Sequence, residues 1–85
     1  MTRPMILTEA EQVLESRAAA YGPASASLDK IAARWSQILG CEVTPAQVVL
    51  CMIDLKMVRL SHDAGHRDSL LDVIGYAVLM AEARK

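Results

Sequence analysis

The 85-residue sequence contains no Phe, and Tyr21, Trp35 and Tyr76 are its only aromatic residues. Its two cysteines are too few for a disulfide scaffold and lack metal-site spacing, which favours a reducing, cytoplasmic setting. An excess of one charge sign is also absent, because the formal net charge is -1, and this argues against nucleic acid as a partner. No apolar run approaches the roughly 20 residues of a membrane span, so we expect no membrane partner.

Apolar side chains are abundant by contrast, at 53% of the sequence, and thirteen residues are Ala. This fraction excludes a disordered chain, and the length fits a single domain over residues 1–85. We expect residues 1–7 to be a flexible N-terminal segment without the long apolar stretch of a secretory signal. A chain this short and this apolar is expected to complete its core by homo-oligomerisation.

Start and stop signals divide the chain into four helices and predict an all-α fold. The predicted helices span about residues 9–20, 26–39, 45–62 and 67–83. The first begins at a capping box on Thr8, and the second at Ser25 or Ser27 as N-cap. The third has the clearest start, with Thr44 as N-cap and Pro45 at the first helical position.

The third predicted helix is apolar almost all round, which predicts that neighbours bury it on several sides. Its central charges include Lys56 and Arg59, which are spaced i, i+3. On the fourth helix, Asp68, Asp72 and Tyr76 are spaced i, i+4, i+8 and form one stripe. An antiparallel hairpin of the two helices would place position 56 opposite roughly position 73, so these two polar stripes can face each other.

Charges in apolar surroundings must be paired or must hold a ligand, and the pattern leaves both interpretations open. In the first, Arg59–Asp72 and Lys56–Asp68 are structural ion pairs. In the second, the group is a binding site in which Lys56 and Arg59 contact phosphate. Tyr76, together with Tyr21 on its glycine turn, would then contact a base or ribose.

Two other chemistries are less well supported by the spacing. Asp68 and Asp72 are potential ligands of a hard metal ion, but the nearby cations oppose metal loading, so we expect no metal and no catalytic residue. His62 and His66 bracket a glycine-containing turn that breaks the register of a metal pair. We expect His66 or Asp68 to cap the fourth helix instead.

The chain resembles a group of short phage and prophage proteins of unassigned function over about residues 9–83. The residues that carry this resemblance are Arg17, Tyr21-Gly22, Ile31-Ala32, Trp35-Ser36, Leu39-Gly40, Thr44-Pro45, Lys56, Arg59, His66-Arg67-Asp68-Ser69, Asp72 and Gly75-Tyr76-Ala77. That group is distantly similar to nucleotide-modification-associated domains and to all-α nucleotide pyrophosphatases of MazG type. The resemblance implies a helical oligomer that acts on nucleotides in the cytoplasm of the host cell.

The resemblance to the pyrophosphatases is incomplete at their metal site. Those enzymes hold magnesium with acidic clusters on two helices, and here only Asp68 and Asp72 match. Lys56 and Arg59 stand where the other carboxylates would be. We therefore expect a binding protein without a cofactor that holds a phosphorylated, nucleotide-like ligand and sequesters a host nucleotide signal. The alternatives are a magnesium-dependent nucleoside triphosphate pyrophosphohydrolase and a protein–protein interaction module without a ligand.

Overall fold

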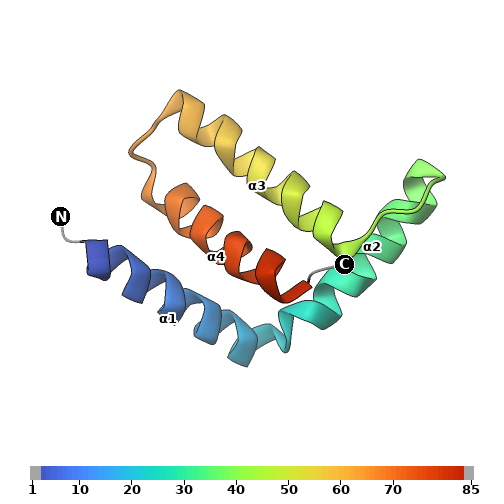
Figure 1. The fold of residues 1–85 in the computed structure, drawn as a ribbon, viewed down its shortest axis with the longest axis horizontal. Helices are drawn as coiled ribbons and strands as arrows, with labels where there is room; N and C mark the ends of the chain where they lie inside the picture. Colours follow the sequence, from blue (N-terminus) through green and yellow to red (C-terminus); the bar gives the residue numbers. More distant parts are fainter. Residues whose placement is uncertain (1–2, 84–85) are drawn as a thin grey trace.

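The computed structural model describes residues 3–83, which form four α-helices and contain no strand (Figure 1). The all-α prediction is therefore confirmed. The helices are α1 (Arg3–Tyr21), α2 (Ala24–Leu39), α3 (Pro45–His62) and α4 (Arg67–Ala83). Within this described part of the chain, no helix is both long enough and apolar enough to cross a membrane.

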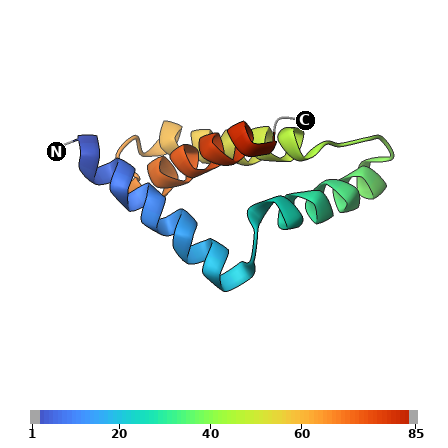
Figure 2. The same cartoon turned by 60° about the horizontal axis from the view of Figure 1, so that its bottom comes forward.

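The α3–α4 hairpin is the centre of the fold, because every other helix packs against it. Its two helices run antiparallel (Figure 1). We call the end with the connection between α3 and α4 the turn end, and the end with the start of α3 and the end of α4 the open end. α1 lies along the side of α4 away from α3, and α2 lies across the open end. Viewed from a second side, α1 and α2 diverge from one another like the arms of a V beneath the hairpin (Figure 2). The two helices therefore contact opposite ends of the same hairpin.

The clearest signals for helix ends in the sequence are confirmed by the structure. Thr44 forms the expected capping box: its Oγ1 accepts from the Gln47 amide at 3.2 Å, and its own amide donates to Gln47 Oε1 at 3.0 Å. Gly40 ends α2 with φ of 71°, a left-handed conformation that glycine adopts without strain. Ser36 holds the connection that follows, because its hydroxyl accepts from the Val43 amide at 2.8 Å.

The starts of α1 and α2 differ from the prediction. α1 begins at Arg3, so residues 3–7 are helical and Thr8 lies inside the helix, while residues 1–2 lie outside the described part. Proline is tolerated in a first turn, where its missing N–H is not needed, so Pro4 does not prevent this early start. α2 begins at Ala24 with Pro23 as N-cap and no side-chain cap bond, so neither Ser25 nor Ser27 caps it.

A compact core lies at the open end of the hairpin, where α2 packs against it. Its buried residues are Leu28 and Ala32 of α2 and Val48 and Val49 of α3. Partly buried side chains, including that of Trp35, pack around them. Small residues and valines at the centre allow the three helices to approach one another closely.

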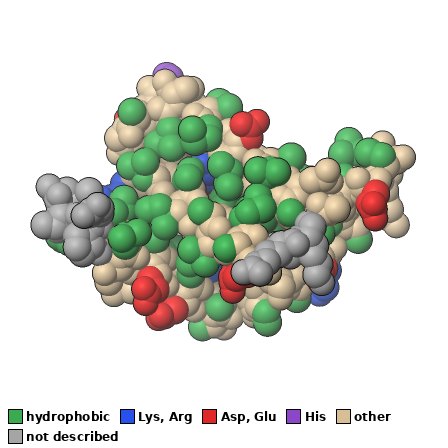
Figure 3. All heavy atoms as spheres, in the orientation of Figure 1, with side chains coloured by type: hydrophobic (Ala, Val, Ile, Leu, Met, Phe, Trp, Pro, Cys, Tyr) green, Lys and Arg blue, Asp and Glu red, His purple; other side chains and the backbone are tan. Residues whose placement is uncertain are grey.

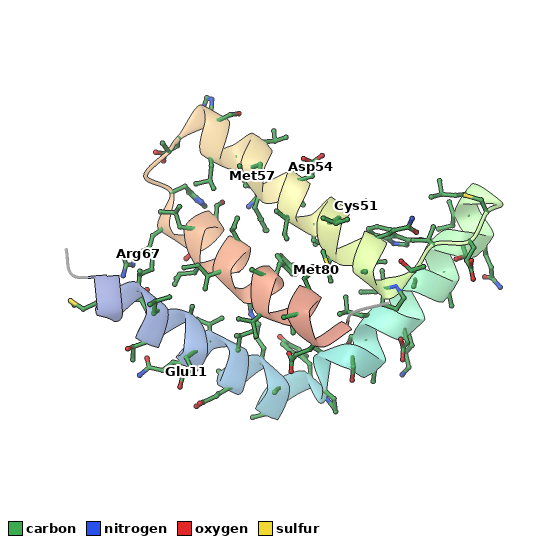
Figure 4. All side chains as sticks on the ribbon, viewed as in Figure 1. Glu11, Cys51, Asp54, Met57, Arg67 and Met80 are labelled. Carbon is green, nitrogen blue, oxygen red and sulfur yellow. The ribbon has the colours of Figure 1, made fainter. Side chains whose placement is uncertain are left out.

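The prediction that neighbours bury α3 on several sides is wrong for the single chain. Leu50, Leu55, Met57 and Val58 are 47–65% exposed, and Cys51 is exposed beside them. We call these five residues the outer face of α3. The space-filling view shows hydrophobic side chains gathered over α3 and α4, and Figure 4 places Asp54 on α3 between Cys51 and Met57 (Figures 3 and 4). The other three helices of the described chain therefore leave this face of α3 uncovered.

Candidate functional site

Asp72 is the centre of the charged group on the hairpin. Its Oδ2 lies 3.2 Å from Lys56 Nζ on α3, and its Oδ1 accepts a hydrogen bond from Arg17 Nη2 on α1 at 3.3 Å. The side chains of Lys56 and Asp72 are only 13% and 14% exposed, whereas that of Arg17 is 56% exposed. One largely buried carboxylate therefore joins three helices.

The pairing differs from the two structural pairs that the spacing suggested. Lys56 pairs with Asp72, not with Asp68, and Arg59 forms no ion pair within the described residues. The reason is the register of the hairpin, which places position 56 beside position 72. Arg17 was missed as a partner because it lies on a helix that is remote in sequence and approaches α4 only in the folded chain.

A pocket of about 320 Å³ opens beside Asp72, where α1 meets the turn end of the hairpin. It is lined by Val13, Arg17, Arg59, His66, Asp68, Leu71 and Asp72. Arg59 and Asp68 are exposed residues, so their charged groups are available to a bound molecule. The folded chain thus gathers cations and carboxylates from three helices around one hollow.

His66 belongs to this pocket as well as to the start of α4. Its Nδ1 accepts from the Ser69 amide at 3.3 Å and lies 2.7 Å from the Ser69 hydroxyl. Ser69 is buried, so this pair closes the first turn of α4. The expectation that His66 caps the fourth helix is confirmed; its place in the pocket was missed, because the cap role alone explained the residue.

The structure brings four of the six predicted site residues together, namely Lys56, Arg59, Asp68 and Asp72. The two tyrosines lie elsewhere. Tyr76 packs against the core at the open end of the hairpin, and Tyr21 is 80% exposed at the end of α1. Neither lines the pocket. Their contact with a base or ribose stays a prediction.

The carboxylates of the pocket do not match the donor set of a magnesium site. Among the side chains that the structure describes, no group of three or more His, Cys, Asp or Glu residues is placed to hold a metal ion. Asp72 is already engaged by Lys56 and Arg17, so a metal would have to displace both cations. The Arg59 guanidinium, which forms no ion pair with the described residues, is a group that donates hydrogen bonds to anions.

A second ion pair fixes α1 to the start of α4. Arg67 donates from Nε and Nη2 to the two carboxylate oxygens of Glu9 at 2.9 and 3.0 Å, and Figure 4 shows Arg67 close to α1. The hydrogen bonds from Arg67 lower the pKa of Glu9 below its ordinary value of 4.5, and those to Glu9 raise the pKa of Arg67. This bidentate pair helps to hold α1 beside the pocket.

Comparison with known proteins identifies the family. Residues 5–84 match the family described as "Domain of unknown function (DUF6378)", and the chain belongs to this family. It is 39% identical over 74 residues to the "Gene 55 protein" of Mycobacterium phage L5, which covers 85% of this chain. The chain spans about half (47%) of that relative's length. No solved structure matches the chain. The relative confirms the similarity to phage proteins.

Proposed function

We propose that this member of the DUF6378 family binds a phosphorylated, nucleotide-like ligand in the pocket between α1 and the hairpin, without hydrolysing it. The observation that carries the proposal is Arg59, an exposed guanidinium that lines the pocket without an ion pair among the described residues. A guanidinium offers a planar fork of donors that suits phosphate oxygens.

The balance of charge around the pocket supports an anionic ligand. Arg17 and Arg59 line it, and Lys56 lies behind Asp72, against two carboxylates, those of Asp68 and Asp72. Asp72 forms ion pairs with Lys56 and Arg17, so its charge is already compensated within the protein. Arg59 remains to neutralise a phosphate, and Asp68 remains to accept from a hydroxyl group.

In a phage-encoded protein, such binding would serve to sequester a host nucleotide signal in the cytoplasm of the host cell. Binding without hydrolysis fits the pairing of Asp72 with Lys56 and the presence of Arg59 in the pocket, since a guanidinium neutralises phosphate but does not activate water. The enzyme alternative, a magnesium-dependent pyrophosphohydrolase, requires carboxylates that are free to bind metal. The third alternative, an interaction module, requires no ligand in the pocket.

The proposal is tested by calorimetric titration with pyrophosphate and with nucleoside mono-, di- and triphosphates. We expect the wild-type protein to bind at least one of them and Arg59→Ala to weaken that binding by about tenfold or more, which corresponds to about 1.4 kcal/mol. Arg34→Ala is the matched control, because Arg34 is an exposed arginine on α2 that does not line the pocket.

Three results would overturn the proposal. These are absence of binding to every phosphate compound, equal binding by Arg59→Ala and wild type, and release of nucleoside monophosphate that requires magnesium. The last result would establish the enzyme alternative. Absence of binding together with capture of a protein partner would favour the interaction module.

We further propose that the outer face of α3 binds a second copy of this chain. This face carries Leu50, Leu55, Met57 and Val58, with Asp54 as its central charge. It spans residues 50–58 of α3, about 13 Å along the helix axis, which is enough for contact with a second helix. Native mass spectrometry is expected to show an oligomer for the wild type and a monomer for Val58→Asp. A wild-type monomer would contradict it.

A further inference from the structure

The contacts of His66 with Ser69 favour one tautomer of its ring. The Ser69 amide can only donate a hydrogen bond, and it lies 3.3 Å from His66 Nδ1. The amide contact favours a lone pair on this nitrogen, and the Ser69 hydroxyl, which can donate or accept, lies 2.7 Å from the same atom. A neutral imidazole whose Nδ1 accepts carries its proton on Nε2.

The second ring nitrogen has no partner among the described residues. Nδ1 is occupied by Ser69, which is only 1% exposed, so the ring is held in place from one side. The histidine also lines the pocket together with Arg17 and Arg59. The donor that the ring offers to a bound molecule is therefore Nε2–H, and a site with two guanidiniums favours an anionic acceptor.

We propose that His66 is a ligand-binding residue whose Nε2–H donates to a terminal phosphate of the ligand; this inference rests on the proposed function and adds a residue and a ligand group to it. Arg59 on α3 and His66 at the start of α4 line the pocket, and Arg17 on α1, which donates to Asp72 through Nη2, lines it with its remaining N–H groups. A terminal phosphate has three non-bridging oxygens, one for each of these donors.

The other charged groups that face His66 are Asp68 and Asp72 of α4. Asp72 is paired with Lys56 and Arg17, and among the described residues neither carboxylate forms an ion pair or hydrogen bond with His66. The amino end of α4 adds a favourable partial positive charge next to the same position. The Nε2–H donor of His66 is thus available to an acceptor on a bound molecule.

One substitution separates the two roles of His66. Asparagine is among the best N-cap residues, and its Oδ1 stands at the place of Nδ1, so His66→Asn keeps the bond from the Ser69 amide. It removes the Nε2–H donor. We expect His66→Asn to keep the wild-type melting temperature and to lose about five- to tenfold in affinity for pyrophosphate. His66→Ala is expected to lose affinity and melting temperature together.

The outcomes distinguish this inference from the proposed function. If His66→Asn binds pyrophosphate like the wild type while Arg59→Ala does not, the proposed phosphate contact of His66 is wrong, and the proposed ligand binding in the pocket is supported. If neither variant differs from the wild type, or if the wild type does not bind, the pocket itself is wrong and the inference fails with it. Long-range ¹H–¹⁵N NMR of the ligand-free protein is expected to show the Nε2–H tautomer, and an Nδ1–H tautomer would overturn the inference without any ligand.

Discussion

The two ends of the α3–α4 hairpin are held together by different interactions. At the open end, Val48 and Val49 are fully buried against Leu28 of α2. At the turn end, α1 meets the hairpin through the carboxylate of Asp72 and a pocket lined by charged side chains. The first arrangement excludes water, and the second keeps polar groups in partial contact with it.

This difference predicts that the two ends contribute differently to stability and to the placement of α1. Burial of apolar side chains contributes about 25 cal/mol per Å², independently of direction, so the open end stabilises the fold. Buried charges lose much of their attraction to desolvation and contribute specificity more than stability. The turn end therefore specifies how α1 is placed and leaves donors available to a ligand.

The largest expected effect on stability comes from the open end. Leu28→Ala removes a buried side chain from the core and is expected to lower the free energy of unfolding by about 3 kcal/mol. Urea denaturation measures this loss, and calorimetry under native conditions is expected to show unchanged pyrophosphate affinity. A large loss of affinity in the folded variant would contradict the division of tasks between the two ends.

An intermediate effect is expected at the turn end. Asp72→Asn leaves Lys56, whose side chain is 13% exposed, without its carboxylate, so we expect a loss of about 2 kcal/mol in the same denaturation measurement. Asp68→Asn is the matched control, because Asp68 is exposed and forms no ion pair with the described residues. Its effect on stability is expected to stay within about 0.5 kcal/mol. Equal losses would mean that Asp72 has no special structural role.

The smallest effect concerns the exposed pair of Glu9 and Arg67. Since the pKa of Glu9 is lowered in the folded state, its contribution is present above the ordinary value of 4.5 and is lost as the pH falls through the lowered pKa. Thermal melts are expected to show Glu9→Gln slightly below the wild type at pH 7 and equal to it at pH 2. NMR titration of the Glu9 carboxyl is expected to return to its ordinary midpoint in Arg67→Gln.

Most of the fold follows from local chemistry and was therefore predictable. The capping box of Thr44 and the glycine at position 40 act through neighbouring backbone groups, so their positions in the sequence locate the ends of α2 and α3. Thr8 shows the limit of such reasoning. It has the sequence pattern of a cap, yet the helix continues through it to Arg3, because Pro4 is tolerated in a first turn and Met5 and Leu7 are good helix formers.

The candidate site was predictable only in part. Periodicity placed Lys56, Arg59, Asp68 and Asp72 on facing stripes, and the structure gathers them. Arg17 and the pocket role of His66 depend on where α1 crosses the hairpin, which no local pattern encodes. The separation of Tyr76 from the pocket has the same origin, because one helical stripe passes from the turn end to the core at the open end.

The amino-acid sequence by itself determined that this protein is all-α, where its connections lie, and which charges stand on its most apolar helices. These properties arise from residues within one or two helical turns of each other. Only the tertiary structure decided that Lys56 pairs with Asp72, that Arg17 joins them, and that Arg59 and His66 line one pocket. Those contacts depend on packing angles and register between helices, which are set by the fit of whole surfaces.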